Sequence, residues 1–178
     1  MPATLAPETA ASERIVPAKA APEALRPLYA AGAYLRTSGT IESSLLHLVD
    51  LRASQMNACA FCIAMHWREA KEAGLSDDHL HGLPAWRETP WYTDRQRAAL
   101  AWTEALTDIA HTHAPDDVYE QARKAFTDRE LVDLTLAITT INSWNRIQIA
   151  FRVNPETAPD VIAARKKSAE AKTPVAAR

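Results

Sequence analysis

Apolar residues along this chain recur three or four positions apart, which is the spacing of one face of an α-helix. Glycine is scarce, with four among 178 residues, and long segments are rich in alanine and leucine. These features predict an all-α fold, a single-domain helical bundle of about six helices. We expect the helices over residues 22–36, 40–56, 58–73, 94–109, 116–125 and 127–152.

Several helix boundaries carry specific signals. Asn57 is a good N-cap for the third helix, and Gly74 is suited to end it. Thr127, with Glu130 three residues later, has the pattern of a capping box for the last helix. Residues 84–90, which contain two prolines, are expected to form a loop.

The last helix carries apolar side chains on nearly all its faces. They are Leu131, Val132, Leu134, Leu136, Ile138, Ile141, Trp144, Ile147 and Phe151. A helix that is apolar all round lies in the centre of a fold or at a subunit interface, which is compatible with a homo-oligomer. Asn142, Asn145 and Arg146 interrupt this surface. Because buried polar groups need partners, we expect them to hydrogen-bond across a helix or subunit contact.

The two ends of the chain differ from its middle. Residues 1–21 are rich in alanine and proline and are expected to form a flexible arm. Residues 154–178 are polar and are expected to form a disordered tail. The helical domain therefore spans residues 22–153.

Charge and hydropathy narrow the class of protein. The formal net charge is -2, which gives no reason to expect nucleic acid or an anionic membrane as a partner. No run approaches the roughly 18–20 apolar residues of a membrane span, and the N-terminus lacks the apolar core of a signal peptide. We therefore expect a cytoplasmic protein, in which a C-x-x-C pair is more often catalytic or metal-binding than structural.

Cys59 and Cys62 are the two cysteines of the chain, and His66 follows four residues after the second. Residues three and four apart share a helix face, so the sulfurs can pair and the imidazole can exchange a proton with Cys62. The positive end of the helix dipole favours the thiolate. Peroxide would oxidise one sulfur to a sulfenic acid, and the other would then close a disulfide. This pattern favours redox chemistry.

Two other interpretations of the cysteines stay open. In the first, zinc takes three ligands from Cys59, Cys62 and His66. Its fourth ligand would be His79 or His81, although these two are too close together to form a usual second ligand pair. In the second, the cysteines are inert and pack as small apolar side chains.

The run Leu51–His66, with the sequence LRASQMNACAFCIAMH, closely resembles the alkyl hydroperoxidase D-like branch of the carboxymuconolactone decarboxylase superfamily. Residues 97–106 are similar to the same branch, and so are residues 130–138 and the positions that follow, Asn142, Trp144, Asn145 and Arg146. The resemblance covers roughly residues 22–153. It implies an all-α fold of packed helices and assembly into dimers, trimers or hexamers.

The resemblance also implies a role for each site residue. It makes Cys62 the peroxide-attacking thiol, Cys59 its resolving partner and His66 the proton relay. Peroxidase members usually carry a glutamate twelve residues before the first cysteine, where this chain has His47. An imidazole can also pass protons near neutral pH, and Asp50 lies one turn further on, so a proton relay can still form there. A second departure is Phe61, where the best-known peroxidases have a histidine.

We therefore predict a thiol-dependent peroxidase, an oxidoreductase that reduces small hydroperoxides through a redox-active Cys59–Cys62 disulfide. An unidentified thiol reductant would reset it, with no metal or nucleotide cofactor. The alternative, motivated by His47, is a dithiol redox sensor or stress-response protein whose disulfide alters oligomer contacts. A lactone decarboxylase is a third hypothesis, and the C-x-x-C counts against it because that activity belongs to superfamily members without the motif.

Overall fold

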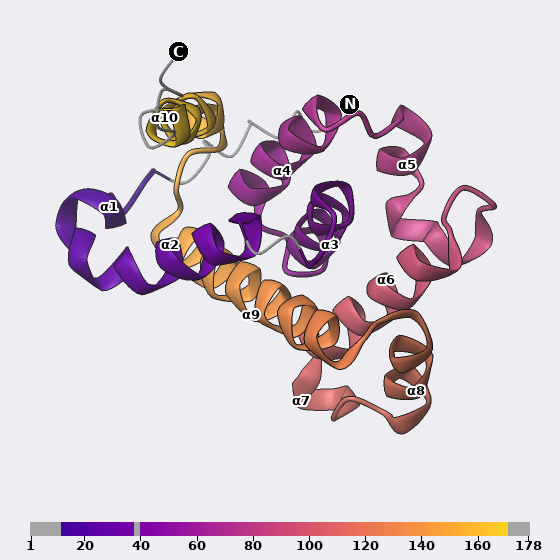
Figure 1. Cartoon of the computed structure of the whole chain (residues 1–178). Helices are drawn as coiled ribbons and strands as arrows, with labels where there is room; N and C mark the ends of the chain where they lie inside the picture. The colour runs from indigo at the N-terminus through magenta and orange to yellow at the C-terminus, as the bar shows by residue number, and fades with distance from the viewer. Residues whose placement is uncertain (1–11, 38–39, 171–178) are drawn as a thin grey trace, which may run out of the picture.

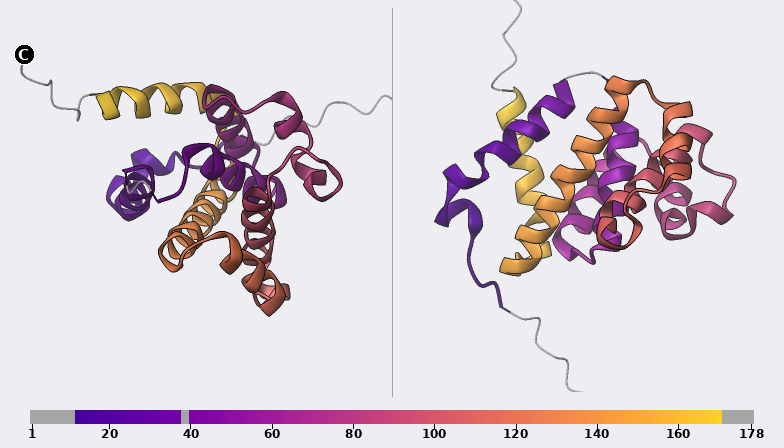
Figure 2. Two further views of the ribbon diagram at one scale, coloured as in Figure 1. Left: turned by 45° about the vertical axis from the view of Figure 1, so that its right-hand side comes forward. Right: turned by 90° about the horizontal axis from the view of Figure 1, so that it is seen from below.

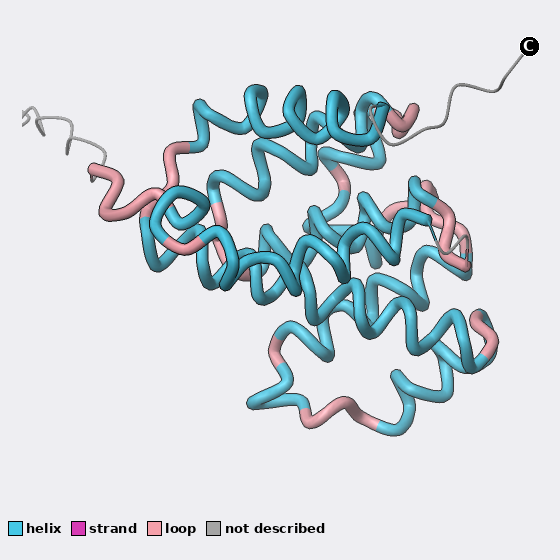
Figure 3. Tube along the Cα trace, turned by 60° about the vertical axis from the view of Figure 1, so that its left-hand side comes forward, coloured by secondary structure: helices cyan, strands magenta, loops and turns pink. Residues whose placement is uncertain are grey.

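The computed structural model describes residues 12–37 and 40–170, and within them the chain is helical with no β-strand (Figure 3). The all-α class is therefore confirmed. The expected helices are α2 (Pro22–Thr37), α3 (Ser43–Met56), α4 (Ala60–Glu72), α6 (Asp94–Thr107), α8 (Asp116–Ala125) and α9 (Asp128–Phe151). Shorter elements are α1 (Pro17–Ala20), α5 (Asp77–His81), the 3-10 helices η1 (Leu83–Glu88) and η2 (Pro155–Thr157), α7 (Ile109–Thr112) and the C-terminal α10 (Ala158–Glu170).

The capping box expected at the start of α9 is confirmed. The Thr127 hydroxyl accepts a hydrogen bond from the backbone N–H of Glu130, and the Glu130 carboxylate accepts one from the backbone N–H of Thr127. The helix ends at Arg152, whose left-handed φ of 52° closes the last turn. These two ends define a helix of 24 residues that crosses the whole bundle (Figure 1).

Helix α3 lies at the centre of the bundle, in contact with α4, α6 and α9 (Figure 1). Buried apolar side chains fill both sides of it. On one side Leu45 and Val49 pack with residues of α6, α8 and α9, and on the other Leu48 and Leu51 pack with residues of α4, α5 and α6. Helix α3 is therefore enclosed by other helices on both sides, and α4 packs directly against it.

The stretch 84–90, expected to be a loop, lies largely in η1, so this prediction is wrong. Leu83 and Trp86 on η1 are 0% and 4% exposed. Burial of these two apolar side chains against α3 and α6 stabilises a helical turn. The two prolines in this stretch favoured the prediction of a loop.

Glu104 on α6 ties η1 to the centre of the bundle. Its carboxylate accepts hydrogen bonds from Trp86 Nε1 at 2.9 Å, from Arg52 Nε on α3 at 2.7 Å, and from Arg87. Burial opposes ionisation of this group, but the hydrogen bonds and the charge of Arg52 outweigh it and lower the pKa of Glu104 below its usual 4.5.

The C-terminal segment is a correction to the expected disordered tail. From Asn154 to Glu170 the chain forms η2 and α10 instead. Ala158 and Ile162 on α10 are 0% and 6% exposed and pack against α4. Two apolar residues four positions apart lie on one helix face and can pack it against a neighbouring helix. The polar composition of the segment gives no sign of this short apolar pattern.

The N-terminal arm is also partly folded. Residues 17–20 form α1, and the backbone N–H of Arg14 donates to the carbonyl oxygen of Phe151 at 3.0 Å. This contact ties the arm to the end of α9. The rest of the expected arm and tail, residues 1–11 and 171–178, lies outside the described residues.

Along the described part of the chain, no helix combines the length and apolarity needed to span a membrane. On α9, Val132 and Ile149 are 66% and 45% exposed in the single chain. They are available for the subunit contact expected of this helix, and oligomerisation stays a prediction.

Candidate functional site

The two cysteines lie at the start of α4 and are joined as a disulfide, with their α-carbons 5.3 Å apart. Cys59 is the N-cap of α4, and its Sγ accepts a hydrogen bond from the backbone N–H of Cys62 at 3.4 Å. The expected N-cap at Asn57 is wrong, because Asn57 is the C-cap of α3. The positive end of the α4 dipole therefore lies at the sulfur atoms, where it favours a thiolate after reduction.

A buried amide network holds the turn between α3 and α4. Within this turn Ala58 has a left-handed φ of 54°. The Asn57 side chain donates to the amide oxygens of Asn142 and Asn145 at 2.9 Å each, and the Asn145 amide donates to Ser54 Oγ at 3.1 Å. The expectation that these α9 asparagines bond across a helix contact is confirmed. They fix the cysteine turn to α9.

The C-terminal helix covers the sulfur atoms. Cys59 and Cys62 are each 1% exposed. They share an apolar cluster with Phe61, Met65, Ala158 and Ile162, of which the last two belong to α10. Figure 2 shows α10 along the outside of the bundle, and it packs there on α4. The sulfurs are therefore enclosed, and α10 forms part of their cover.

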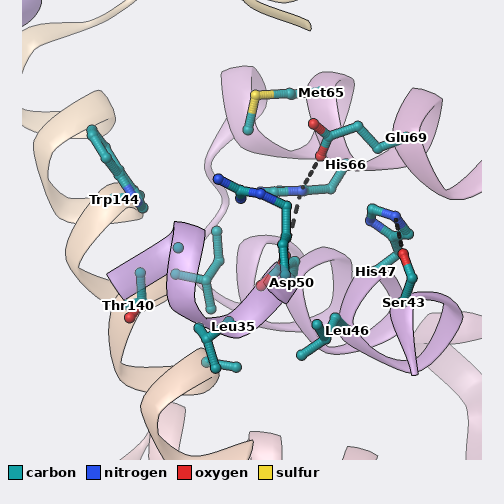
Figure 4. A pocket seen from close by; sticks show the side chains of 14 residues that line it. Leu35, Ser43, Leu46, His47, Asp50, Met65, His66, Glu69, Thr140 and Trp144 are labelled. Carbon is teal, nitrogen blue, oxygen red and sulfur yellow. Dashed lines mark hydrogen bonds and ion pairs between the residues drawn. The ribbon is translucent and has the colours of Figure 1, made fainter. Parts of the chain in front are cut away.

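His66 lies one turn beyond Cys62 on α4 and is 5% exposed. Its Nδ1 is 2.9 Å from Glu69 Oε2 and 3.7 Å from Asp50 Oδ2 (Figure 4). These carboxylates assign the N–H to Nδ1. Nε2 then carries the lone pair, and this buried nitrogen has no hydrogen-bond partner among the described residues. In its neutral form the ring therefore offers Nε2 as a proton acceptor.

His47 lies on α3, and its Nε2 is 3.2 Å from Ser43 Oγ (Figure 4). Burial lowers the pKa of His47 below its usual 6.5, although the negative charges of Asp50 and Glu69 act in the opposite direction. At neutral pH the imidazole is therefore uncharged and can accept a proton or a ligand.

A cavity of about 140 Å³ opens between α2, α3, α4 and α9 beside these histidines (Figure 4). Its lining is Gly32, Leu35, Arg36, Ser43, Leu46, His47, Asp50, Met65, His66, Glu69, Ala137, Thr140, Ile141 and Trp144. One wall is apolar and the other carries the charged and imidazole groups. Met65 both lines this cavity and packs in the cysteine cluster, so the cavity and the disulfide share a wall.

Sequence reasoning missed Glu69 as part of the site. The spacing of Glu69 from His66, three residues on the expected helix, was the available signal. Arg36 on α2 was also missed, and no local pattern could have placed it in the cavity lining. Phe61, where the peroxidases carry a histidine, is 3% exposed and packs with the sulfur atoms.

The potential metal ligands that the described residues bring together differ from the expected zinc set. His47, His66 and Glu69 place one ligand atom each within 4.8 Å of one another. Cys59 and Cys62 are bonded to each other, and His79 Nδ1 is instead 2.8 Å from Ser76 Oγ on α5. The set that the fold assembles is therefore composed of nitrogen and oxygen.

Comparison with known proteins identifies the family. Residues 22–105 match the carboxymuconolactone decarboxylase family. The chain is also 37% identical over 139 residues to the uncharacterized protein YdfG of Bacillus subtilis, covering 78% of this chain and 94% of YdfG. The chain belongs to the carboxymuconolactone decarboxylase family. The uncharacterized protein YnjA of Escherichia coli is 27% identical over 118 residues, covering 66% of this chain and 64% of YnjA.

Solved structures place the chain in the alkyl hydroperoxidase D-like branch of this family. A protein of unknown function from Agrobacterium tumefaciens, named as a candidate antioxidant defence protein AhpD, is 46% identical. It superposes with a TM-score of 0.78 over 80% of this chain and 97% of its own. The debrominase Bmp8, solved with 2,3,4-tribromopyrrole, is 15% identical, with a TM-score of 0.69 over 81% of this chain and 76% of its own. At that identity Bmp8 shares the fold alone.

Proposed function

We propose that this protein is a thiol-dependent peroxidase that reduces small organic hydroperoxides. The observation that carries the proposal is the Cys59–Cys62 disulfide at the start of α4, with the buried imidazole of His66 one turn further along the same helix. The cavity beside His66, with its apolar wall and volume of about 140 Å³, suits a substrate of a few heavy atoms.

The first step oxidises Cys62. After reduction of the disulfide, the Cys62 thiolate attacks the distal oxygen of the hydroperoxide, so an S–O bond forms as the O–O bond breaks. The alkoxide that leaves takes up a proton and departs as an alcohol. Cys62 becomes a sulfenic acid and the hydroperoxide is reduced by the same two electrons.

The second step closes the disulfide. The Cys59 thiolate attacks the Cys62 sulfur, the S–S bond forms, and hydroxide leaves and is protonated to water. The α-carbon separation of 5.3 Å lies within the range that a disulfide accepts, so α4 need not unwind. An external dithiol then supplies the two electrons that restore both thiols.

His66 would move the proton in these steps. Its Nε2 takes the proton of the Cys62 thiol and returns it to the leaving alkoxide. The carboxylates of Asp50 and Glu69 at Nδ1 stabilise the imidazolium that forms between the two transfers. They supply at this site the negative charge that a glutamate at the position of His47 brings to the peroxidase members.

Stopped-flow consumption of tert-butyl hydroperoxide in the presence of dithiothreitol tests the proposal. Cys62→Ser should abolish turnover, Cys59→Ser should allow one turnover before Cys62 over-oxidises, and His66→Gln should slow turnover about 100-fold. Glu88→Gln, at an exposed carboxylate remote from the cavity lining, is the matched control and should keep the wild-type rate. Wild-type consumption by Cys62→Ser would refute the proposal.

A dithiol redox sensor is the second candidate, and the contact of α10 with the cysteine cluster favours it. Opening the disulfide changes the surface on which Ala158 and Ile162 rest, so reduction could release α10. Hydrogen exchange of α10 amides, measured with the disulfide closed and open, separates the two functions. A sensor would lose α10 protection on reduction while peroxide turnover stays at background.

A further inference from the structure

Two histidine–carboxylate pairs with the same spacing face each other across the α3–α4 contact. His47 and Asp50 are three residues apart on α3, and His66 and Glu69 are three residues apart on α4. Residues at this spacing lie on one face of a helix, and here both faces line the same cavity (Figure 4). Two imidazoles and two carboxylates are thus collected from two neighbouring helices.

The ligand atoms of His47, His66 and Glu69 lie close enough together to approach one ion. His66 Nδ1 is 2.9 Å from Glu69 Oε2 and 3.7 Å from Asp50 Oδ2, and a ligand nitrogen of His47 lies within 4.8 Å of the His66 and Glu69 atoms. Tetrahedral zinc with bonds of about 2.0–2.1 Å holds adjacent ligand atoms about 3.3 Å apart. Rotamer adjustments on the order of 1 Å would therefore complete the coordination.

Two ring nitrogens around the group have no hydrogen-bond partner within the described structure. They are His47 Nδ1 and His66 Nε2, and both are buried. A buried nitrogen without a partner is costly, so a coordinating ion at His47 Nδ1 would remove part of that cost. His66 is 5% exposed and its ring is held by the carboxylates, which pre-organises the site.

We propose that His47, His66 and Glu69 bind one divalent transition-metal ion such as zinc. Imidazole and carboxylate ligands suit zinc and the neighbouring first-row metals, and no thiolate is involved. The cavity lining carries two carboxylates, those of Asp50 and Glu69, and one guanidinium, that of Arg36. Arg36 is exposed, and its positive charge in the same cavity lining opposes the binding of a cation there.

This site stands on its geometry and does not rest on the proposed peroxidase function. It nevertheless has a consequence for that function. A metal on His66 Nδ1 displaces the proton to Nε2, which removes the lone pair that would take the Cys62 proton. Metal occupancy and peroxide turnover should then exclude each other, so the ion would act as an inhibitor.

Titration of the full-length protein with Zn²⁺ and Co²⁺, with the disulfide closed, tests the site. Closing the disulfide removes thiolates as competing ligands. We expect one ion per chain by calorimetry, and a Co²⁺ visible spectrum without the near-ultraviolet sulfur-to-metal band. His47→Ala and Glu69→Gln should each weaken binding at least tenfold, and Arg36→Gln should tighten it several-fold because it removes the competing charge.

His111→Ala is the matched control, because His111 forms a similar pair with Asp108 at 2.6 Å on an exposed surface. It should leave the dissociation constant unchanged. Far-ultraviolet circular dichroism confirms that each variant is folded before it is titrated. The proposal is overturned if the wild type binds no ion, or if folded His47→Ala and Glu69→Gln bind as tightly as the wild type. Peroxidase activity is not a readout here, so failure of the metal site leaves the proposed function standing.

Discussion

The contact of α10 with the cysteine cluster makes a quantitative prediction about access to the disulfide. Ile162 is 6% exposed and packs in the cluster that contains Cys59 and Cys62. If a reductant reaches the sulfurs only when α10 lifts away from α4, then weakening this contact must speed reduction. Ile162→Ala weakens this contact and leaves the cysteines and the residues of the cavity lining unchanged.

The magnitude follows from two opposing effects. Removing the buried part of an isoleucine costs about 2 kcal/mol at the low end of the range for core positions, which fits a peripheral helix. Alanine is the better helix former, which returns about 0.4 kcal/mol. The net loss of about 1.5 kcal/mol raises the open population of α10 roughly tenfold.

The assay is the rate of disulfide reduction at one low dithiothreitol concentration, followed by alkylation of the released thiols and mass spectrometry. Ile162→Ala should raise the rate constant about tenfold. Ala163→Met is the control, because Ala163 is exposed and methionine has a similar helix propensity. An equal rate constant in Ile162→Ala and the wild type would show that reagents reach the sulfurs with α10 in place, and the reasoning would fail.

Three further predictions concern the elements that hold the site. Asn145→Ala removes the hydrogen bonds to Asn57 and Ser54, which stabilise the fold by about 1 kcal/mol each. The thermal unfolding midpoint, measured by calorimetry, should fall by about 4–8 °C. An unchanged midpoint would contradict the stabilising role of the network. The left-handed backbone of Ala58 costs about 1–2 kcal/mol, and Ala58→Gly removes this cost. The greater chain entropy of glycine in the unfolded state offsets about half of the gain. The substitution should raise the midpoint by about 2 °C, whereas Ala33→Gly within α2 should lower it. Because the pKa of Glu104 is lower in the folded than in the unfolded state, its ionised carboxylate stabilises the fold above about pH 4.5. This stabilisation is lost as the pH falls through the pKa of the folded state. Glu104→Gln should thus cost about 2 kcal/mol at pH 7 in urea unfolding, and this cost should shrink progressively as the pH falls below 4.5.

The long helices and their ends are properties that the sequence determines locally. The capping box of Thr127 and Glu130 involves groups within one turn, so the residues predict it without a fold. The C-x-x-C-x-x-x-H pattern likewise brings Cys59, Cys62 and His66 to one helix face by spacing alone. Errors arose where burial overrides local signals, as at η1 and α10, where a few apolar side chains anchor segments of loop-like or polar composition.

The composition of the site was decided by tertiary packing. Asp50 reaches His66 because α3 and α4 pack at a particular crossing position and with particular faces turned toward each other. The residue spacing within either helix does not encode this packing. The same holds for the asparagines of α9 beneath the cysteine turn and for α10 above it. Sequence alone therefore supplied the sulfur atoms, the imidazoles of His66 and His47, and Asp50 as candidates. Only the packed helices brought His47 and Asp50 to His66 and formed the cavity and the cover, since contacts between distant segments depend on how whole helix faces fit together.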